Sequence, residues 1–290
     1  MKSYPKYKAS ILFSISILVL FVTILLISCN KENEILKKEL VVEGYIEQGN
    51  FPLVILTYNT NYFNTIDSAT FRALVASRAK VTVSDGEQSE ILTLDRDTNY
   101  FPPWVYKGFE LVGKVGKIYT LTIEDEIGTA TATTTILPPP VIDSIWFEYN
   151  SNKDTVGVIK GKFTDNANER NYYKTYTKFY RKNKNYVPTL ISTFSDEYFN
   201  GEQITFSLKK GPETYLKPIK DIYFHKGDSL FVKFSSIDKA SYDFWLGYDK
   251  EVINTGNPFA GNHNSIISNI SGGLGIWSGY GSKVFFIVAK

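Results

Sequence analysis

Short runs rich in Val, Ile, Thr and aromatic residues recur from residue 39 onward, and several alternate strictly between apolar and polar side chains. Such alternation places one set of side chains on each face of a β-strand. Asp85 and Gly86 follow one of these runs, and this pair favours a tight turn between two strands. The strands expected in the first half are residues 40–46, 52–58, 79–84, 90–94, 117–123 and 129–137.

Three consecutive prolines, Pro138–Pro140, interrupt this pattern before it resumes. Proline has no backbone N–H and a fixed φ, so a central strand or a helix does not continue through such a run. Helical spacing of apolar residues predicts a short helix over 67–77 and a longer one over 241–255. The strands expected in the second half are residues 142–149, 156–163, 172–181, 189–194, 203–208, 229–234 and 284–289.

These elements predict a mainly β protein. An aromatic content of 15% agrees with this fold class, because flat and branched side chains pack well on a pleated surface. The spacing of strands and turns predicts an Ig-like Greek-key β-sandwich over residues 39–137. A second β-rich domain with one or two short helices is expected over 141–290, with residues 138–140 as the linker.

The first 28 residues have the layout of a bacterial lipoprotein signal peptide. Lysines precede an apolar run over 11–27, and Leu26, Ile27, Ser28 and Cys29 then form a sequence that resembles a lipobox. We expect cleavage before Cys29, lipidation of its thiol, and a polar tether over 29–38 that joins the lipid to the folded chain. The alternative is a retained membrane-spanning helix, for which the apolar run is barely long enough.

Localisation and partners follow from this segment and from the charge balance. Lys31, Glu32 and Glu34 follow Cys29, and this order is similar to a surface-export signal, so we expect an outer-membrane protein that faces the cell exterior. The chain has 32 basic and 30 acidic residues, and three of the lysines precede the cleavage point. This balance gives no concentrated positive field, so nucleic acid is not an expected partner.

Residues that carry chemistry are few. Cys29 is the sole cysteine, so neither an internal disulfide nor a cluster of thiolate ligands can form. His225 and His263 have no second ligand at zinc-binding spacing, and the common nucleophile and phosphate-loop motifs do not occur. The sequence therefore predicts no catalytic residue, no metal site and no cofactor.

Three local patterns have both a functional and a structural interpretation. Residues 165–169 supply carboxylate and amide oxygens suited to Ca²⁺, although a solvated turn is favoured. The acidic pairs Asp165 with Glu169 and Asp196 with Glu197 are too common in type to predict catalysis. The aromatic run over 172–180 could form a ligand platform, but core packing on one face and ordinary surface on the other is the simpler account.

The tail of the chain carries the most unusual composition. Four glycines lie close to two large aromatic residues, which predicts either a binding loop or a tight corner between strands. The residues of this tail motif are Ser268, Asn269, Gly272, Gly273, Gly275, Trp277, Gly279 and Tyr280.

In their order along the chain, the lipidated cysteine and several short segments resemble DUF4249, a lipoprotein family of Bacteroidota. The resemblance covers nearly all of the mature chain, and the tail motif is its most specific part. The segments are residues 40–44, 79–83, 116–121, 138–145, 171–173, 257–259 and 268–280.

The resemblance implies no catalytic residues, because the family has no established activity. Its members are often encoded beside TonB-dependent outer-membrane receptors, which implies an accessory binding role in nutrient uptake. Two alternatives stay open at this point: an envelope protein that binds only other proteins, and a glycan or peptide hydrolase whose carboxylates meet only in the folded chain. The sequence predicts neither the ligand nor the strand order.

Overall fold

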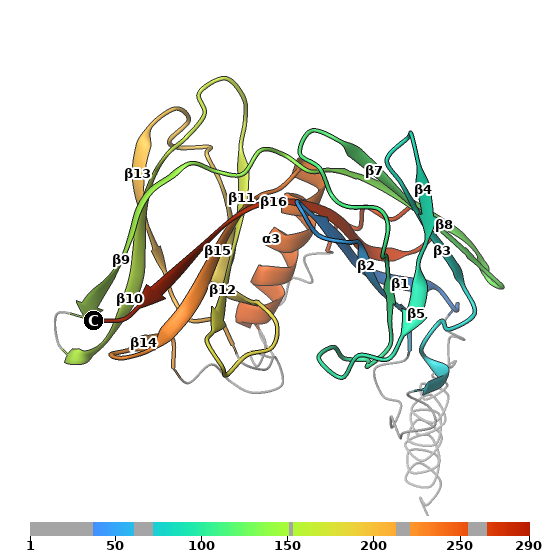
Figure 1. The fold of residues 1–290 in the computed structure, drawn as a ribbon, viewed down its shortest axis with the longest axis horizontal. Helices are drawn as coiled ribbons and strands as arrows, with labels where there is room; N and C mark the ends of the chain where they lie inside the picture. Colours follow the sequence, from blue (N-terminus) through green and yellow to red (C-terminus); the bar gives the residue numbers. More distant parts are fainter. Residues whose placement is uncertain (1–36, 61–71, 151–152, 213–220, 255–265) are drawn as a thin grey trace, which may run out of the picture. The chain divides into compact units, whose positions relative to one another are not determined.

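The computed structural model describes residues 37–60, 72–150, 153–212, 221–254 and 266–290. Residues 38–290 form one compact unit (Figure 1). The protein is mainly β, as its sequence predicts. Among the described residues, no helix combines the length and the hydropathy needed to span a membrane.

The described strands form three sheets, and one of them is twice as large as either of the others. The eight-stranded sheet has the order β12 (Val187–Ser195), β11 (Tyr172–Phe179), β15 (Ser229–Ser236), β16 (Leu274–Val288), β1 (Leu40–Glu47), β2 (Leu53–Tyr58), β6 (Val105–Lys107) and β5 (Thr93–Asp95). A four-stranded sheet contains β4 (Ser89–Ile91), β3 (Lys80–Ser84), β7 (Ile118–Asp125) and β8 (Gly128–Thr135). The other contains β13 (Gln203–Leu208), β10 (Lys153–Thr164), β14 (Phe224–His225) and β9 (Ile142–Asn150).

The long strand β16 joins the two halves of the large sheet. It pairs in parallel with β1 and antiparallel with β15, so Trp277 lies opposite Gly44 and Phe285 lies opposite Val232. Figure 1 shows this strand running from the first half of the fold into the second. The predicted boundary at residues 138–140 falls between β8 and β9, but both halves use the same strand. Whether each half can fold separately stays a prediction.

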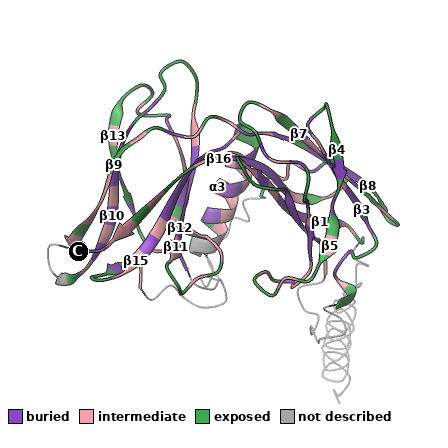
Figure 2. Cartoon of the chain, viewed as in Figure 1, coloured by how far each residue is buried: buried purple, intermediate pink, exposed green. Residues whose placement is uncertain are grey.

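One face of the large sheet covers both smaller sheets. Around β1 and β2 it packs on β3, β7 and β8, with fully buried residues such as Val42, Leu121 and Trp277 in the first sandwich core. Around β11 and β15 it packs on β9, β10 and β13 through a core that includes Phe163 and Phe234. Figure 2 shows many residues of these facing strands as buried. The alternation of side chains along each strand is what allows one face to fill both cores.

Helix α3 (Lys239–Asn254) covers part of the opposite face of the large sheet, over β11, β12 and β16. Asp238 caps this helix by accepting a hydrogen bond from the Ser241 backbone N–H at 2.8 Å. Its other carboxylate oxygen accepts a 2.6 Å bond from the Thr134 hydroxyl on β8, which fixes the helix start against the first sandwich. The aromatic face of α3, including Trp245, then packs on β11 and β16.

Most predicted elements are confirmed, and several differ from their predictions. The single run over 90–94 is split into β4 and β5, because Leu92 turns into the first core between them. Helix α3 begins two residues earlier than predicted, since Asp238 and not a later residue is the cap. The tail motif is only partly a turn: residues 268–273 precede β16 and turn at Gly272, and residues 274–280 form the first half of β16.

The aromatic strand β11 also differs from its prediction. Tyr173 packs in the second sandwich core, and Tyr176 and the fully buried Lys174 lie on the α3 side. Both faces are therefore covered, whereas ordinary surface was expected on one of them. Of the predicted helix over 67–77, Arg72 and Ala73 are helical and residues 67–71 lie outside the described residues.

Candidate functional site

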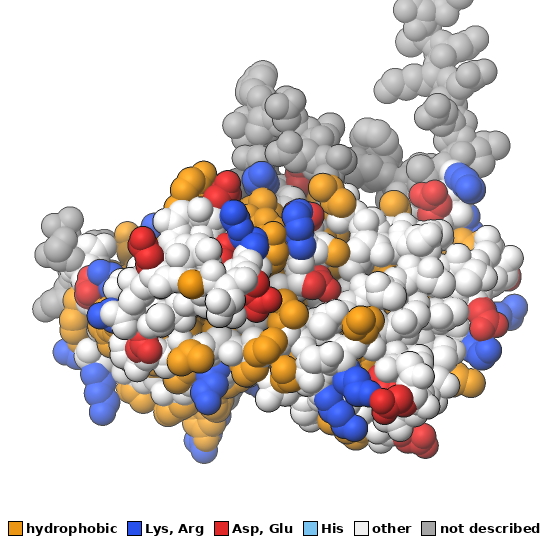
Figure 3. Space-filling view, turned by 90° about the horizontal axis from the view of Figure 1, so that it is seen from above, with side chains coloured by type: hydrophobic (Ala, Val, Ile, Leu, Met, Phe, Trp, Pro, Cys, Tyr) orange, Lys and Arg blue, Asp and Glu red, His pale blue; other side chains and the backbone are white. Residues whose placement is uncertain are grey.

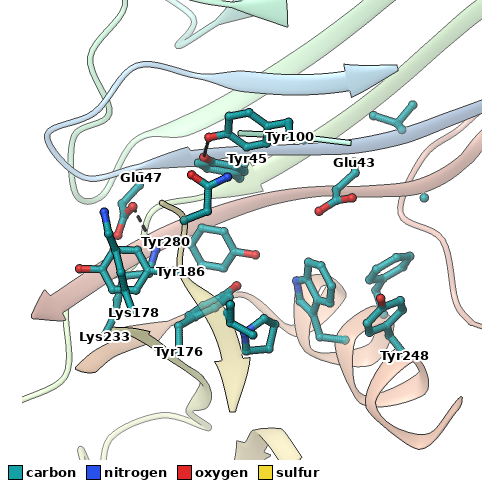
Figure 4. Close-up of a pocket in the computed structure, with 18 of the residues that line it drawn as sticks. Glu43, Tyr45, Glu47, Tyr100, Tyr176, Lys178, Tyr186, Lys233, Tyr248 and Tyr280 are labelled. Carbon is teal, nitrogen blue, oxygen red and sulfur yellow. Dashed lines mark hydrogen bonds and ion pairs between the residues drawn. The ribbon is translucent and has the colours of Figure 1, made fainter. Parts of the chain in front are cut away.

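A cavity of about 630 Å³ lies between α3 and the uncovered part of the large sheet. The sheet provides its floor, α3 provides one wall, and loops after β5 and β11 form its rim (Figure 4). Eight of its lining residues are aromatic. The rings come from Tyr45, Tyr100, Tyr176, Tyr186, Phe244, Trp245, Tyr248 and Tyr280.

Strand β1 supplies the floor through every second residue. Leu40, Val42 and Ile46 point into the first core, so Glu43, Tyr45 and Glu47 point to the opposite side. The parallel register with β16 places Tyr280 beside Glu47. A single strand therefore separates an apolar core from a cavity that contains two carboxylates.

Glu47 is paired with a lysine that aromatic rings surround. The Lys233 ammonium on β15 lies 3.2 Å from the Glu47 carboxylate and is almost fully buried. It lies 4.7 Å from the ring centres of both Tyr176 and Tyr186, and 5.5 Å from that of Tyr280. Burial lowers the pKa of Lys233 and Glu47 opposes this effect. The Glu47–Lys233 ion pair has no net charge, and with the three tyrosine rings around Lys233 it occupies one end of the cavity.

A second buried lysine lies under α3. The Lys174 ammonium donates a 2.7 Å hydrogen bond to the Ser192 hydroxyl, which in turn donates to Asp249 on α3 at 3.0 Å. The Lys174 nitrogen is 4.0 Å from an Asp249 oxygen and 4.2 Å from the ring centre of Trp245. Burial lowers the pKa of Lys174 to about 8, and Asp249 and Glu43 oppose this shift.

Glu43 differs from the other charged groups of the cavity. Its side chain is exposed to the cavity, yet the surrounding protein raises the pKa of its carboxyl group, while Lys174 acts in the opposite direction. Among the described residues, no hydrogen bond or ion pair engages this carboxylate. Figure 4 shows it pointing into the space between β1 and α3. Glu43 is therefore available to a ligand.

The rim joins loops from both halves of the chain. The Asn185 side chain donates a 2.6 Å hydrogen bond to the Asn99 carbonyl oxygen, and the hydroxyls of Tyr45 and Tyr100 are 3.3 Å apart. Lys178 and Lys184 also line the cavity. On the face drawn in Figure 3, basic and acidic side chains are interspersed.

The tail motif contributes to the cavity and to the core at once. Gly275 and Tyr280 line the cavity, whereas Trp277 is fully buried in the first sandwich and donates a 3.0 Å bond to the Tyr119 carbonyl oxygen. Asn269 exchanges two hydrogen bonds with the Trp277 backbone, at 2.8 and 2.9 Å.

The glycines of the motif lie close to neighbouring strands. Gly272 turns the chain beside β8, Gly279 lies close to Thr135 on that strand, and Gly273 lies beside Leu40. Ser268 accepts a bond from the Ile270 backbone.

Other predicted positions lie away from the cavity or outside the described residues. Five of them lie outside the described residues: Leu26, Ile27 and Ser28 of the lipobox, Cys29, and His263. Asp165 accepts hydrogen bonds from the Tyr173 hydroxyl and the Gly201 N–H, which holds a turn together. No group of three or more His, Cys, Asp or Glu residues suited to a metal ion occurs within the described ranges.

Sequence reasoning missed Glu43, Lys174 and Lys233 as site residues. Glu43 and Glu47 are on the same face of a strand with Tyr45 between them, and this alternation was a readable signal. For the lysines no comparable signal existed, because nothing local indicates that α3 covers β11 or that tyrosines surround Lys233.

Comparisons with known proteins identify the family. No curated protein matches the chain. One solved structure with similarity is the chicken interferon gamma receptor alpha chain, at 8% identity and a TM-score of 0.19, over 69% of this chain and 89% of that chain. A TM-score this low supports no conclusion. The model of a domain of unknown function, DUF4249, matches residues 30–284. This match spans most of the sequence, and the chain therefore belongs to the DUF4249 family.

Proposed function

We propose that this protein is a lipid-anchored envelope protein that binds a small ligand in the α3 cavity and assists a TonB-dependent transporter. The lipobox that ends at Cys29 supports the anchor, and the resemblance stated from the sequence supports the transport context. The observation that carries the binding role is the cavity itself.

The size and lining of the cavity are those of a ligand site. Pockets for small molecules measure roughly 300–1,000 Å³ and combine apolar walls with a few polar groups that fix orientation. The cavity of about 630 Å³ has aromatic walls, and Glu43 is an accessible carboxylate without a partner among the described residues. An exposed carboxylate that faces a cavity and has no partner in the described chain can pair with a cationic group of a ligand.

The ion pair of Glu47 favours binding over glycoside hydrolysis. Most glycosidases use two carboxyl groups, one as an acid and the other as a base or a nucleophile. Strand β1 presents Glu43 and Glu47 to the cavity, but Glu47 is engaged in an ion pair with Lys233 at 3.2 Å. Glu43 is then the one carboxylate of β1 that is open to a ligand.

A pull-down from native membranes tests this proposal. A C-terminally tagged chain is extracted in mild detergent beside a Cys29→Ala variant that cannot be lipidated, and both eluates are analysed by native mass spectrometry. We expect a barrel partner with the lipidated chain only, and a small molecule retained by the folded domain. A partner without a ligand would favour a purely structural role. Recovery of the lipidated chain with neither would contradict the proposal.

A further inference from the structure

The cavity carries opposite charges at its two ends. At the α3 end, Lys174 is balanced by Asp249, which lies 4.0 Å away, so the Glu43 carboxylate leaves a net negative charge. The aromatic side chains of Trp245 and Tyr248 line the same region. A carboxylate beside aromatic faces is a suitable site for an organic ammonium group, which gains both an ion pair and cation–π attraction.

The opposite end is positive. Glu47 and Lys233 neutralise one another, so the charge that remains belongs to Lys178 and Lys184. Lys178 lies 5.7 Å from the ring centre of Tyr186, the ring that also contacts Lys233, and this places it at the Glu47 end. In the described part of the chain, neither rim lysine forms an ion pair. Figure 4 draws Lys178 beside Glu47 and well apart from Glu43.

The distance between these ends sets a length for the ligand. The β1 backbone from Glu43 to Glu47 covers roughly 13 Å, because each strand residue advances about 3.3 Å. An extended peptide of three or four residues covers a similar length, at roughly 3.3–3.6 Å per residue. A cavity of about 630 Å³ also accommodates a molecule of this size.

We propose that the cavity binds a zwitterionic ligand of short-peptide size, with its ammonium group at Glu43 and its carboxylate at Lys178 and Lys184. This assignment rests on the proposed binding function and specifies the class of ligand. The aromatic lining contacts the side chains between the two termini without requiring a particular sequence. Both charged ends of the cavity then receive a partner that the described chain does not supply.

Equilibrium dialysis with a defined tripeptide library tests the assignment. The library is prepared with free termini, with acetylated N-termini and with amidated C-termini, and is quantified by mass spectrometry. For the natural chain we expect acetylation to weaken binding at least about tenfold, because it removes the charge that pairs with Glu43. We expect amidation to weaken binding about fivefold, because it removes the charge that pairs with Lys178 and with the exposed Lys184.

Variants then assign each effect to a residue. In Glu43→Gln, acetylation should change binding by less than about twofold, because the two changes remove the same pair. Combined Lys178→Met and Lys184→Met should abolish the effect of amidation in the same way. Glu124→Gln is the matched control: this strand glutamate pairs with Lys80 outside the cavity, and it should behave as the natural chain. Melting temperatures verify that each variant folds.

The natural chain alone can overturn the assignment. Equal binding of free and acetylated peptides would contradict the role of Glu43, even if no variant could be purified. Absence of peptide binding, with binding of the neutral sugar maltotriose, would exclude the zwitterion class and leave the proposed binding function intact. Failure of every probe would overturn the ligand assignment, and a ligand-free pull-down would then contradict the binding function separately.

Discussion

Lys174 is a lysine enclosed in the interior with its charge only partly compensated. It is fully buried, and burial lowers its pKa from 10.5 to about 8. Between these values the unfolded chain binds more protons at this position than the folded chain, so stability rises with pH. Below pH 8 both states are protonated and the full cost of burying the charge is present. The relief on raising the pH is about 1.4 kcal/mol per unit within this window.

The first prediction compares the natural chain with Lys174→Met. From pH 7.5 to 9.5, the natural chain should gain roughly 2 kcal/mol of unfolding free energy relative to the variant. Urea unfolding at several pH values measures this difference, and the comparison cancels contributions from other titrating groups. A difference that does not change with pH would contradict the lowered pKa.

Ile191 occupies an unfavourable backbone conformation beside the same network. Its φ is 56°, in the left-handed region that costs a β-branched residue about 1–2 kcal/mol. It lies where β12 departs from regular pairing with β11, and the next residue, Ser192, donates both its N–H and its hydroxyl to Asp249. The strained backbone at Ile191 therefore lies directly before the residue that bonds to Asp249 on α3.

We predict that Ile191→Gly stabilises the protein. Glycine adopts this φ without strain, and the gain should exceed its greater entropy in the unfolded chain, leaving roughly 0.5–1 kcal/mol. Little burial is lost, because Ile191 is 63% exposed. Ile91, which is 59% exposed in β4 and has no positive φ, provides the control, and Ile91→Gly should destabilise by about 1 kcal/mol. Similar losses for both variants would refute the strain.

For single residues, the sequence predicts which face of a strand a side chain occupies. It does not predict which other element packs on that face. Alternation assigns Glu43 and Tyr45 to one side of β1, as the structure confirms. It also assigns Lys174 and Tyr176 to one side of β11, but the cover over that side comes from a helix more than sixty residues later. Burial of Lys174 is therefore a tertiary property that no local pattern encodes.

Among the elements, β16 depends on one glycine for its pairing with β1. Gly275 has a φ of 114°, and a Cβ at this position would collide with the carbonyl oxygen of Val42. Gly273, two residues earlier, has no positive φ, and its Cβ would approach the Leu40 carbonyl oxygen at 3.0 Å. The two glycines therefore have different tolerances, although they lie in the same motif.

We predict that Gly275→Ala destabilises by roughly 3 kcal/mol or more, since both the backbone angle and the contact with β1 become unfavourable. Gly273→Ala should remain within about 1 kcal/mol of the natural chain, because its angle suits alanine and a small shift relieves the contact. Thermal unfolding of the two variants measures the contrast. Equal melting temperatures would show that the parallel pairing with β1 does not require Gly275.

Element prediction succeeded where a repeating pattern was long enough to read. The alternating run over 117–123 is β7, and the helical run over 241–255 is α3. The glycines of the tail indicated a turn, which occurs at Gly272, but not the strand over 274–280, because glycine normally weakens a strand. Here a bare backbone is needed so that β16 can lie close to β1 and β8, and this need arises from strands more than 130 residues away.

At the scale of the whole molecule, the fold class was predictable from the sequence. It was not predictable that both halves of the chain contribute strands to one sheet. The parallel register that sets Val41 opposite Leu274 joins segments more than 230 residues apart in the sequence. Three prolines at residues 138–140 mark a real change of sheet, from β8 to β9, and therefore resemble a domain boundary. Local composition cannot reveal that the final strand returns to complete the first half.

This shared strand predicts cooperative unfolding. β16 supplies Trp277 to the first core and Ile287 to the second, so loss of either core releases the strand that supports the other. Asp238 adds a second link, because it caps α3 and binds Thr134 on β8. Removing one half would expose apolar area in the other, at roughly 25 cal/mol per Å². Independent stability of either half is therefore unfavourable.

Hydrogen exchange in increasing urea measures this cooperativity on a chain that begins at residue 37. Peptides from β7 and β10 report on the first and second sandwiches, and their protection should be lost at the same urea concentration. The variant Gly275→Ala should lower both midpoints together, because it weakens the strand common to the two sandwiches. Two separate midpoints, with only that of β7 shifted by the variant, would establish instead that residues 39–137 and 141–290 unfold as independent domains.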